Sequence, residues 1–160
     1  ISVFVGYSNG AGPLFSYHYG AQNHMELRNL LKRSLIIIGL TSAAMFAASE
    51  ALARPFSALF LRAAENLLPE SVHAFRIVSV SYLFAGLAVF GSAFFTALND
   101  GLVSARISFL RTFVFELGAV LLLPPLFGVD GIWYSVVLAE MMAAVTGSIY
   151  MAVLQKKYHY

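Results

Sequence analysis

The sequence predicts an all-α fold, a polytopic bundle of transmembrane helices. Of its 160 residues, 59% are hydrophobic and only 11% are charged, whereas a soluble domain is about 45–50% apolar and about 25% charged. The apolar residues also gather in five separate stretches. Together these observations exclude the soluble globular, disordered, collagen-like and nucleic-acid-binding classes of protein.

Each apolar stretch has the length of roughly 20 residues that a helix needs to cross a bilayer core of about 30 Å. The five predicted spans are residues 1–21, 34–53, 77–98, 107–127 and 132–154. Strands of a membrane barrel would alternate apolar and polar residues. The runs at 35–38 and 121–123 are continuously apolar, so helices are favoured over strands.

The first stretch has no formal charge but is rich in glycine and polar side chains. The four-residue spacing of Gly6 and Gly10 suits close packing of helices. Its polar residues allow two interpretations: one face lines a water-filled cavity, or the tyrosines form an interfacial belt. Tyr7, Asn9 and Tyr17 are the polar or aromatic side chains that such a face would present.

The second stretch carries one charge, Glu50, and the third carries none. We expect Glu50 to pair with Arg54 at the end of its helix, because side chains four residues apart share a helix face. The long connection at 54–76 mixes apolar residues with charges. Its middle, residues 57–68, is expected to form either a short amphipathic helix at the membrane interface or an ordered loop.

The fourth stretch carries Arg111 and Glu116, and the fifth carries Glu140. Arg111 lies near the start of its helix and is expected to extend to the membrane surface. Glu116 and Glu140 lie near the midplane, where charges are costly and therefore informative. A buried carboxyl has a raised pKa, so both are candidates for ion coupling. The alternative is a pair of neutral glutamic acids that hydrogen-bond two helices together.

The placement of lysine and arginine predicts the orientation of the chain. Connections at one end carry six basic residues, Arg28, Lys32, Arg33, Arg106, Lys156 and Lys157. The opposite end carries Arg54, Arg62 and Arg76. The first end is predicted to face the cytoplasm, which places the N-terminus outside and the C-terminus inside. A start outside without a signal peptide also predicts further chain upstream.

Motifs for catalysis are missing from the sequence. It has no cysteine, no phosphate-binding loop followed by lysine, and no serine nucleophile motif. Its four histidines do not have metal-ligand spacing. We therefore expect no enzyme activity, no metal site and no cofactor.

Three motifs resemble those of the multidrug and toxin extrusion (MATE) family. Residues 6–23, GYSNGAGPLFSYHYGAQN, resemble the family's eighth transmembrane helix. Residues 94–99, FFTALN, resemble the end of its tenth helix. Residues 128–133, GVDGIW, resemble the turn before its twelfth helix.

The resemblance implies a two-lobe fold of twelve helices, in which this chain is helices eight to twelve of the C-terminal lobe. Helix seven and the N-terminal lobe would then be partners absent from this chain. It also implies a secondary transporter in a bacterial cell membrane that exports small organic cations in antiport with protons or sodium. Helices eight and ten border the cavity in the family, and aromatic faces attract cations. The resemblance therefore implies Tyr7, Asn9, Tyr17 and, in the third stretch, Tyr82 as the candidate cavity-lining residues. Some members carry a cation-binding carboxylate in helix seven or ten, whereas residues 77–98, the stretch that resembles helix ten, have no acid.

Two other functions stay open at this point. One is a flippase for lipid-linked saccharides from the same superfamily, which would be favoured by several cationic residues in a cavity. The other is a membrane scaffold or receptor that transports nothing.

Overall fold

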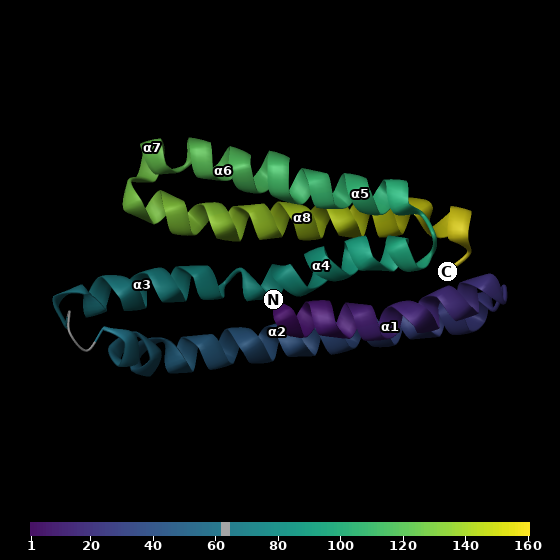
Figure 1. The fold of residues 1–160 in the computed structure, drawn as a ribbon, viewed down its shortest axis with the longest axis horizontal. Coiled ribbons are helices and arrows are strands. Elements are labelled where there is room, and N and C mark those ends of the chain that lie inside the picture. The colour runs from purple at the N-terminus through teal and green to yellow at the C-terminus, as the bar shows by residue number, and fades with distance from the viewer. Residues whose placement is uncertain (62–64) are drawn as a thin grey trace.

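The computed structural model describes residues 1–61 and 65–160, and every regular element among them is a helix. The long helices run alternately in opposite directions in an elongated bundle (Figure 1). The elements are α1 (Ser2–Gly20), α2 (His24–Phe60), the 3-10 helix η1 (Glu65–Leu67), α3 (Leu68–Ser79), α4 (Tyr82–Ala97), α5 (Gly101–Phe109), the π-helix η2 (Leu110–Glu116), α6 (Leu117–Leu122), α7 (Pro124–Phe127) and α8 (Val129–Tyr158).

The predicted all-α fold is confirmed, and most of the predicted spans have the length and apolarity to cross a membrane. In the described residues, three segments qualify, namely α2, the combined segment Gly101–Phe127 and α8. Helices α3 and α4 meet at a bend of 42° and qualify only as a pair. Helix α1 occupies the first predicted stretch but is not among the qualifying segments, because glycine and polar residues interrupt its apolar ones.

Helix α2 is longer than the predicted span. It continues past residue 53 and through Pro55 to Phe60. The described residues therefore do not form the separate interfacial helix expected at 57–68. The first residues of this segment are the last residues of α2, and Glu65–Leu67 form only the short helix η1. Residues 62–64 of that segment lie outside the described residues.

Two turns at one end of the bundle have the same construction. Gln22 and Asn99 adopt positive φ angles of 55° and 60°, which reverse the chain after α1 and α4. The next residues, Asn23 and Asp100, each accept a hydrogen bond from the amide three positions on, at 3.2 and 3.1 Å. These side-chain caps satisfy the first turns of α2 and α5. The C-terminal end of α8 lies at the same end (Figure 1).

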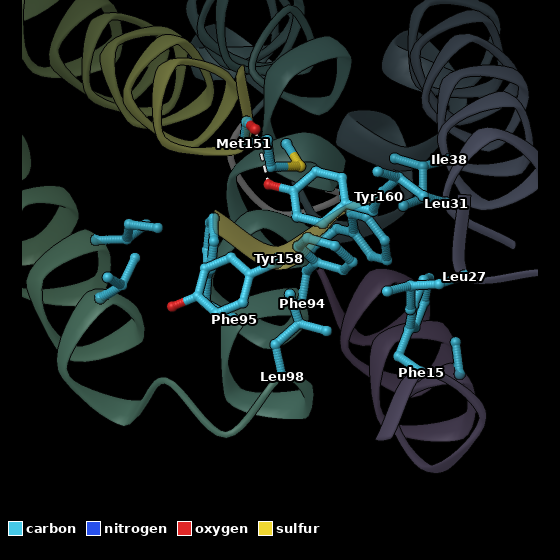
Figure 2. Packing of buried hydrophobic residues seen from close by; sticks show 14 residues of the cluster. Phe15, Leu27, Leu31, Ile38, Phe94, Phe95, Leu98, Met151, Tyr158 and Tyr160 are labelled. Atoms are coloured by element: carbon cyan, nitrogen blue, oxygen red, sulfur yellow. Dashed lines mark hydrogen bonds between the residues drawn. The ribbon is translucent and has the colours of Figure 1, made fainter. Parts of the chain in front are cut away.

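An aromatic cluster fixes how the helices meet at this end. Phe94 of α4 contacts the ring of Phe15 from α1 with centroids 5.1 Å apart, and the ring of Tyr160 at 4.9 Å. The Tyr160 hydroxyl donates to the carbonyl of Met151 at 2.7 Å. Figure 2 shows the chain after α8 folding back so that Tyr160 lies between α8 and α2. Edge-to-face contacts of this kind add about 0.5–1.5 kcal/mol each beyond area burial.

Helix α4 lies between α1 and α2 on one side and α8 on the other (Figure 1). At Gly86 an added Cβ would lie 2.7–2.8 Å from side-chain atoms of Phe4, Ser42 and Ile38. At Gly91 it would lie 3.3 Å from the Cα of Gly147. Both positions therefore use glycine to let neighbouring helices approach closely, as small residues do in membranes.

We expect Gly86→Ala to lower the free energy of unfolding by about 1–3 kcal/mol, because the methyl group overpacks the junction of three helices. Gly39→Ala in α2 is the control, since an added Cβ there meets nothing within 4 Å. Thermal unfolding of both variants in detergent measures the difference. Equal midpoints would contradict close packing at Gly86.

Candidate functional site

A buried ion pair joins the fourth and fifth predicted spans. Arg111 Nη2 donates to Glu140 Oε1 at 2.6 Å, and the two side chains are 25% and 11% exposed. Glu140 follows the start of α8 by 11 residues, which is about 16 Å along the helix axis. The pair thus lies well away from both ends of α8, where its members compensate each other's charge.

A π-helix carries the arginine of this pair. Residues Leu110–Glu116 form η2, which packs against α8. Hydrogen bonds from i to i+5 widen the turn and change which side chains face a neighbour, and such segments are frequent at functional sites. The expectation that Arg111 reaches the membrane surface is wrong, because its guanidinium binds Glu140 of α8 instead.

The second oxygen of Glu140 is open. Glu140 Oε2 is buried and finds no hydrogen-bond partner in the described residues. A carboxylate oxygen in a dry setting is costly without a partner. Arg111 binds Oε1 of the carboxylate. The unpartnered Oε2 can still accept a proton, a cation or a hydrogen bond from a donor.

Glu116, the second midplane candidate, has a different environment. It ends η2 and is exposed at the bundle surface. In the described residues no hydrogen bond or ion pair joins it to Arg111 or Glu140. The structure therefore does not bring the two glutamates together in one site.

The candidate cavity-lining residues are distributed over two helices. The Tyr7 hydroxyl donates to Ser34 Oγ at 2.8 Å and so links α1 to α2. Asn9 and Tyr17 are exposed, Tyr17 by 70%, and lie about 80° apart around α1. Tyr82 is the first residue of α4 and is half-buried. No hydrogen bond connects these four residues to one another in the part of the chain that the structure describes.

The exposed face of α1 is open rather than packed. A Cβ added at Gly6 or Gly10 would meet nothing within 4 Å, so their spacing does not serve helix packing within the described chain. The opposite face of α1 is buried through Phe4, Ser8, Ala11 and Phe15. Asn9 and Tyr17 thus share a polar, glycine-containing face that the described helices leave uncovered.

At the other end of the bundle, the predicted pair of Glu50 with Arg54 is wrong. Glu50 Oε1 accepts a hydrogen bond from Ser79 at 2.6 Å, and its Oε2 lies 3.7 Å from Arg76 Nε. Ser79 is fully buried. Contacts between α2 and α3 replace the local pair because α3 packs along α2 and presents both partners to the carboxylate.

A polar cluster closes the end of the bundle that carries the two similar turns. Asp100 Oδ2 accepts hydrogen bonds from the Tyr158 hydroxyl and from Lys157 Nζ, the latter at 3.2 Å. The Tyr158 phenol, and after it the amide of Val103, hold the pKa of Asp100 below its usual value. This cluster could not be predicted from the sequence, because Asp100 and Tyr158 are 58 positions apart and give no local signal.

Metal-ligating side chains do not cluster in the described residues. No group of three or more histidine, aspartate and glutamate side chains there has the arrangement to hold a metal ion. Four of the carboxylates lie near a basic side chain instead, namely those of Glu50, Asp100, Asp130 and Glu140.

Breaking the Arg111–Glu140 pair is expected to destabilise the protein. Arg111→Met leaves Glu140 without its counter-charge, and removing one partner of a fully buried pair costs about 3–5 kcal/mol. We expect about 1–3 kcal/mol here, because Arg111 is 25% exposed and the pair is therefore not fully buried. Arg106→Met is the control, since Arg106 is exposed. Equal unfolding free energies of the two variants would refute a stabilising pair.

Asp100 is expected to make stability sensitive to acid. Because its pKa is lowered in the folded state, its contribution is complete above the unfolded value of about 3.9 and is lost as pH falls through the folded pKa. Asp100→Asn keeps a capping side chain but removes the charge. The loss of stability between about pH 5 and pH 3 should therefore be smaller in this variant than in the wild type. Thermal melts across this range test it, with Glu26→Gln as the control. If the thermal midpoint of Asp100→Asn depended on pH as that of the wild type does, the Asp100 charge would not contribute to the acid sensitivity.

Comparison with known proteins agrees with this architecture. A family model, MatE, matches residues 1–121. Two of the three motifs noted in the sequence lie inside the match, while residues 128–133 and Glu140 lie beyond it. No curated protein and no solved structure matches the chain. The helical, apolar chain therefore belongs to the MatE family of membrane transporters, which are not enzymes.

Proposed function

We propose that this chain is part of a secondary active exporter of small, cationic, amphipathic organic compounds, driven by antiport of protons or sodium. The observation that carries the proposal is the Arg111–Glu140 pair at mid-membrane depth, with its open carboxylate oxygen. Within the same proposal, the chain corresponds to helices eight to twelve. It works in the cell membrane with a further lobe and has its C-terminus in the cytoplasm.

The pair offers a simple coupling device. Glu140 holds Arg111 through one oxygen, and a proton or sodium ion on the carboxylate weakens that attraction by removing its net charge. Arg111 is then released, and α8 and η2 lose the contact that fixes them to each other. An ion that binds one arrangement more tightly than the other shifts the balance between the two.

The substrate face is proposed on α1. Asn9 and Tyr17 are exposed there, and tyrosine rings attract organic cations. Tyr7 fixes the helix by its bond to Ser34, and Tyr82 stands at the bend between α3 and α4. Glu116 is a second candidate for ion coupling because it is an exposed acid on a membrane-spanning segment.

Among the described residues, Arg111 is already neutralised by Glu140. A flippase for an anionic lipid-linked saccharide would need unpaired cations at mid-membrane depth, so this observation favours the exporter over the flippase. In a scaffold that transports nothing, the Arg111–Glu140 pair would only hold η2 and α8 together, and the unpartnered Oε2 of Glu140 would have no role.

We expect Glu140→Gln in the complete protein to slow efflux of ethidium by about tenfold or more, a typical size for lost coupling between two sites. Efflux is measured in cells that lack other exporters, and ion flux in proteoliposomes shows whether protons or sodium move in exchange. Glu116→Gln is measured in parallel, and Glu26→Gln at the bundle end is the matched control.

Size-exclusion profiles establish that each variant is folded. Unchanged efflux in folded Glu140→Gln and Glu116→Gln would leave Glu140 with a packing role only and Glu116 with no part in ion coupling. No efflux of several cationic dyes by the unaltered protein would refute the exporter itself.

A further inference from the structure

Two adjoining grooves run down the bundle from the end that carries most of the basic residues. The first, of about 350 Å³, opens between α2, α4 and α8, and Arg28, Lys32 and Gln155 line it. The second, of about 480 Å³, continues between α4 and α8. The two share Leu87, Ser148 and Ala152 as lining residues. They therefore form one continuous depression with a basic mouth and an apolar interior.

The mouth carries uncompensated positive charge. Arg28 and Lys32 are exposed and lie four residues apart on the same face of α2. The ion pairs in the described residues use Arg76, Arg111, Lys157 and His73, so no carboxylate there pairs with either residue. Tyr160 closes the groove at this end and is itself buried and held by the carbonyl of Met151.

The interior is apolar and has the length of one lipid leaflet. From Gln155 at the mouth to Ala144 at the far end, α8 spans 11 residues, or about 16 Å. One half of a hydrocarbon core of about 30 Å is about 15 Å. Ser148, the polar residue on this wall, donates its hydroxyl to the carbonyl of Ala144 at 2.8 Å, so it presents no free donor to the groove.

We propose that this depression binds an anionic phospholipid. Its phosphate lies between Arg28 and Lys32, and one acyl chain lies along Leu87 and Ala152 between α4 and α8. Net negative headgroups fit the mouth better than zwitterionic ones, because basic pockets between membrane helices select anionic lipids by charge. The same two residues lie just before the apolar run that starts at Leu35, which places them at headgroup depth.

The test uses the complete protein in neutral detergent and follows its thermal midpoint with added lipid. Phosphatidylglycerol should raise the midpoint, whereas phosphatidylcholine and inorganic phosphate should leave it unchanged. Arg28→Gln and Lys32→Gln should each weaken the apparent lipid affinity by about fivefold. Arg33→Gln is the matched control, because Arg33 is exposed at the same end but does not line the groove.

The acyl chain is tested separately from the headgroup. Ala152→Trp should fill the groove and abolish the effect of phosphatidylglycerol without changing charge, while Val153→Trp, which lies outside both grooves, should not. Stabilisation by inorganic phosphate alone would overturn the proposal in favour of a simple anion site. An equal loss in Arg33→Gln would overturn it in favour of general surface charge, and an unchanged effect in Ala152→Trp would overturn the placement of the chain.

Discussion

The close approach of α4 to its neighbours is the constraint on which the rest of the structure depends. Without side chains at Gly86 and Gly91, α4 meets α1 and α2 on one side and the backbone of α8 at Gly147 on the other. In a bilayer no hydrophobic force draws apolar helices together, so van der Waals contact of this kind and hydrogen bonds between helices hold them. The position of α8 against α4 then determines where Glu140 lies.

The helices themselves were predictable, because runs of apolar residues of membrane length leave few other folds. Their interruptions were not. The π-helix at Leu110–Glu116 contains Arg111 and lies within a predicted span whose sequence gives no sign of a break in the α-helix. Arg111 lies near the start of its predicted span, and nothing in the local sequence indicates that a neighbouring helix supplies its partner.

The candidate site was predictable in part. Glu140 stood out because a carboxylate deep in an apolar span is costly, but its partner did not, since Arg111 and Glu140 are 29 positions apart. Glu50 shows the same limit, because a local rule favoured Arg54 while α3 supplies Arg76 and Ser79 instead. Rules of helix spacing describe isolated helices, and in a bundle the neighbouring helix competes for every polar group.

Helix α8 contributes residues both to the Arg111–Glu140 ion pair and to the wall of the groove with the basic mouth. It carries Glu140 in the middle of the membrane, and two to three turns further on it carries Ser148 and Ala152 in the wall shared by the two grooves. A rigid displacement of α8 that separates Glu140 from Arg111 also moves that wall relative to Leu87. A ligand in the groove that binds one position of α8 better must therefore alter the ion pair, and by linkage an ion on Glu140 alters binding in the groove to the same extent.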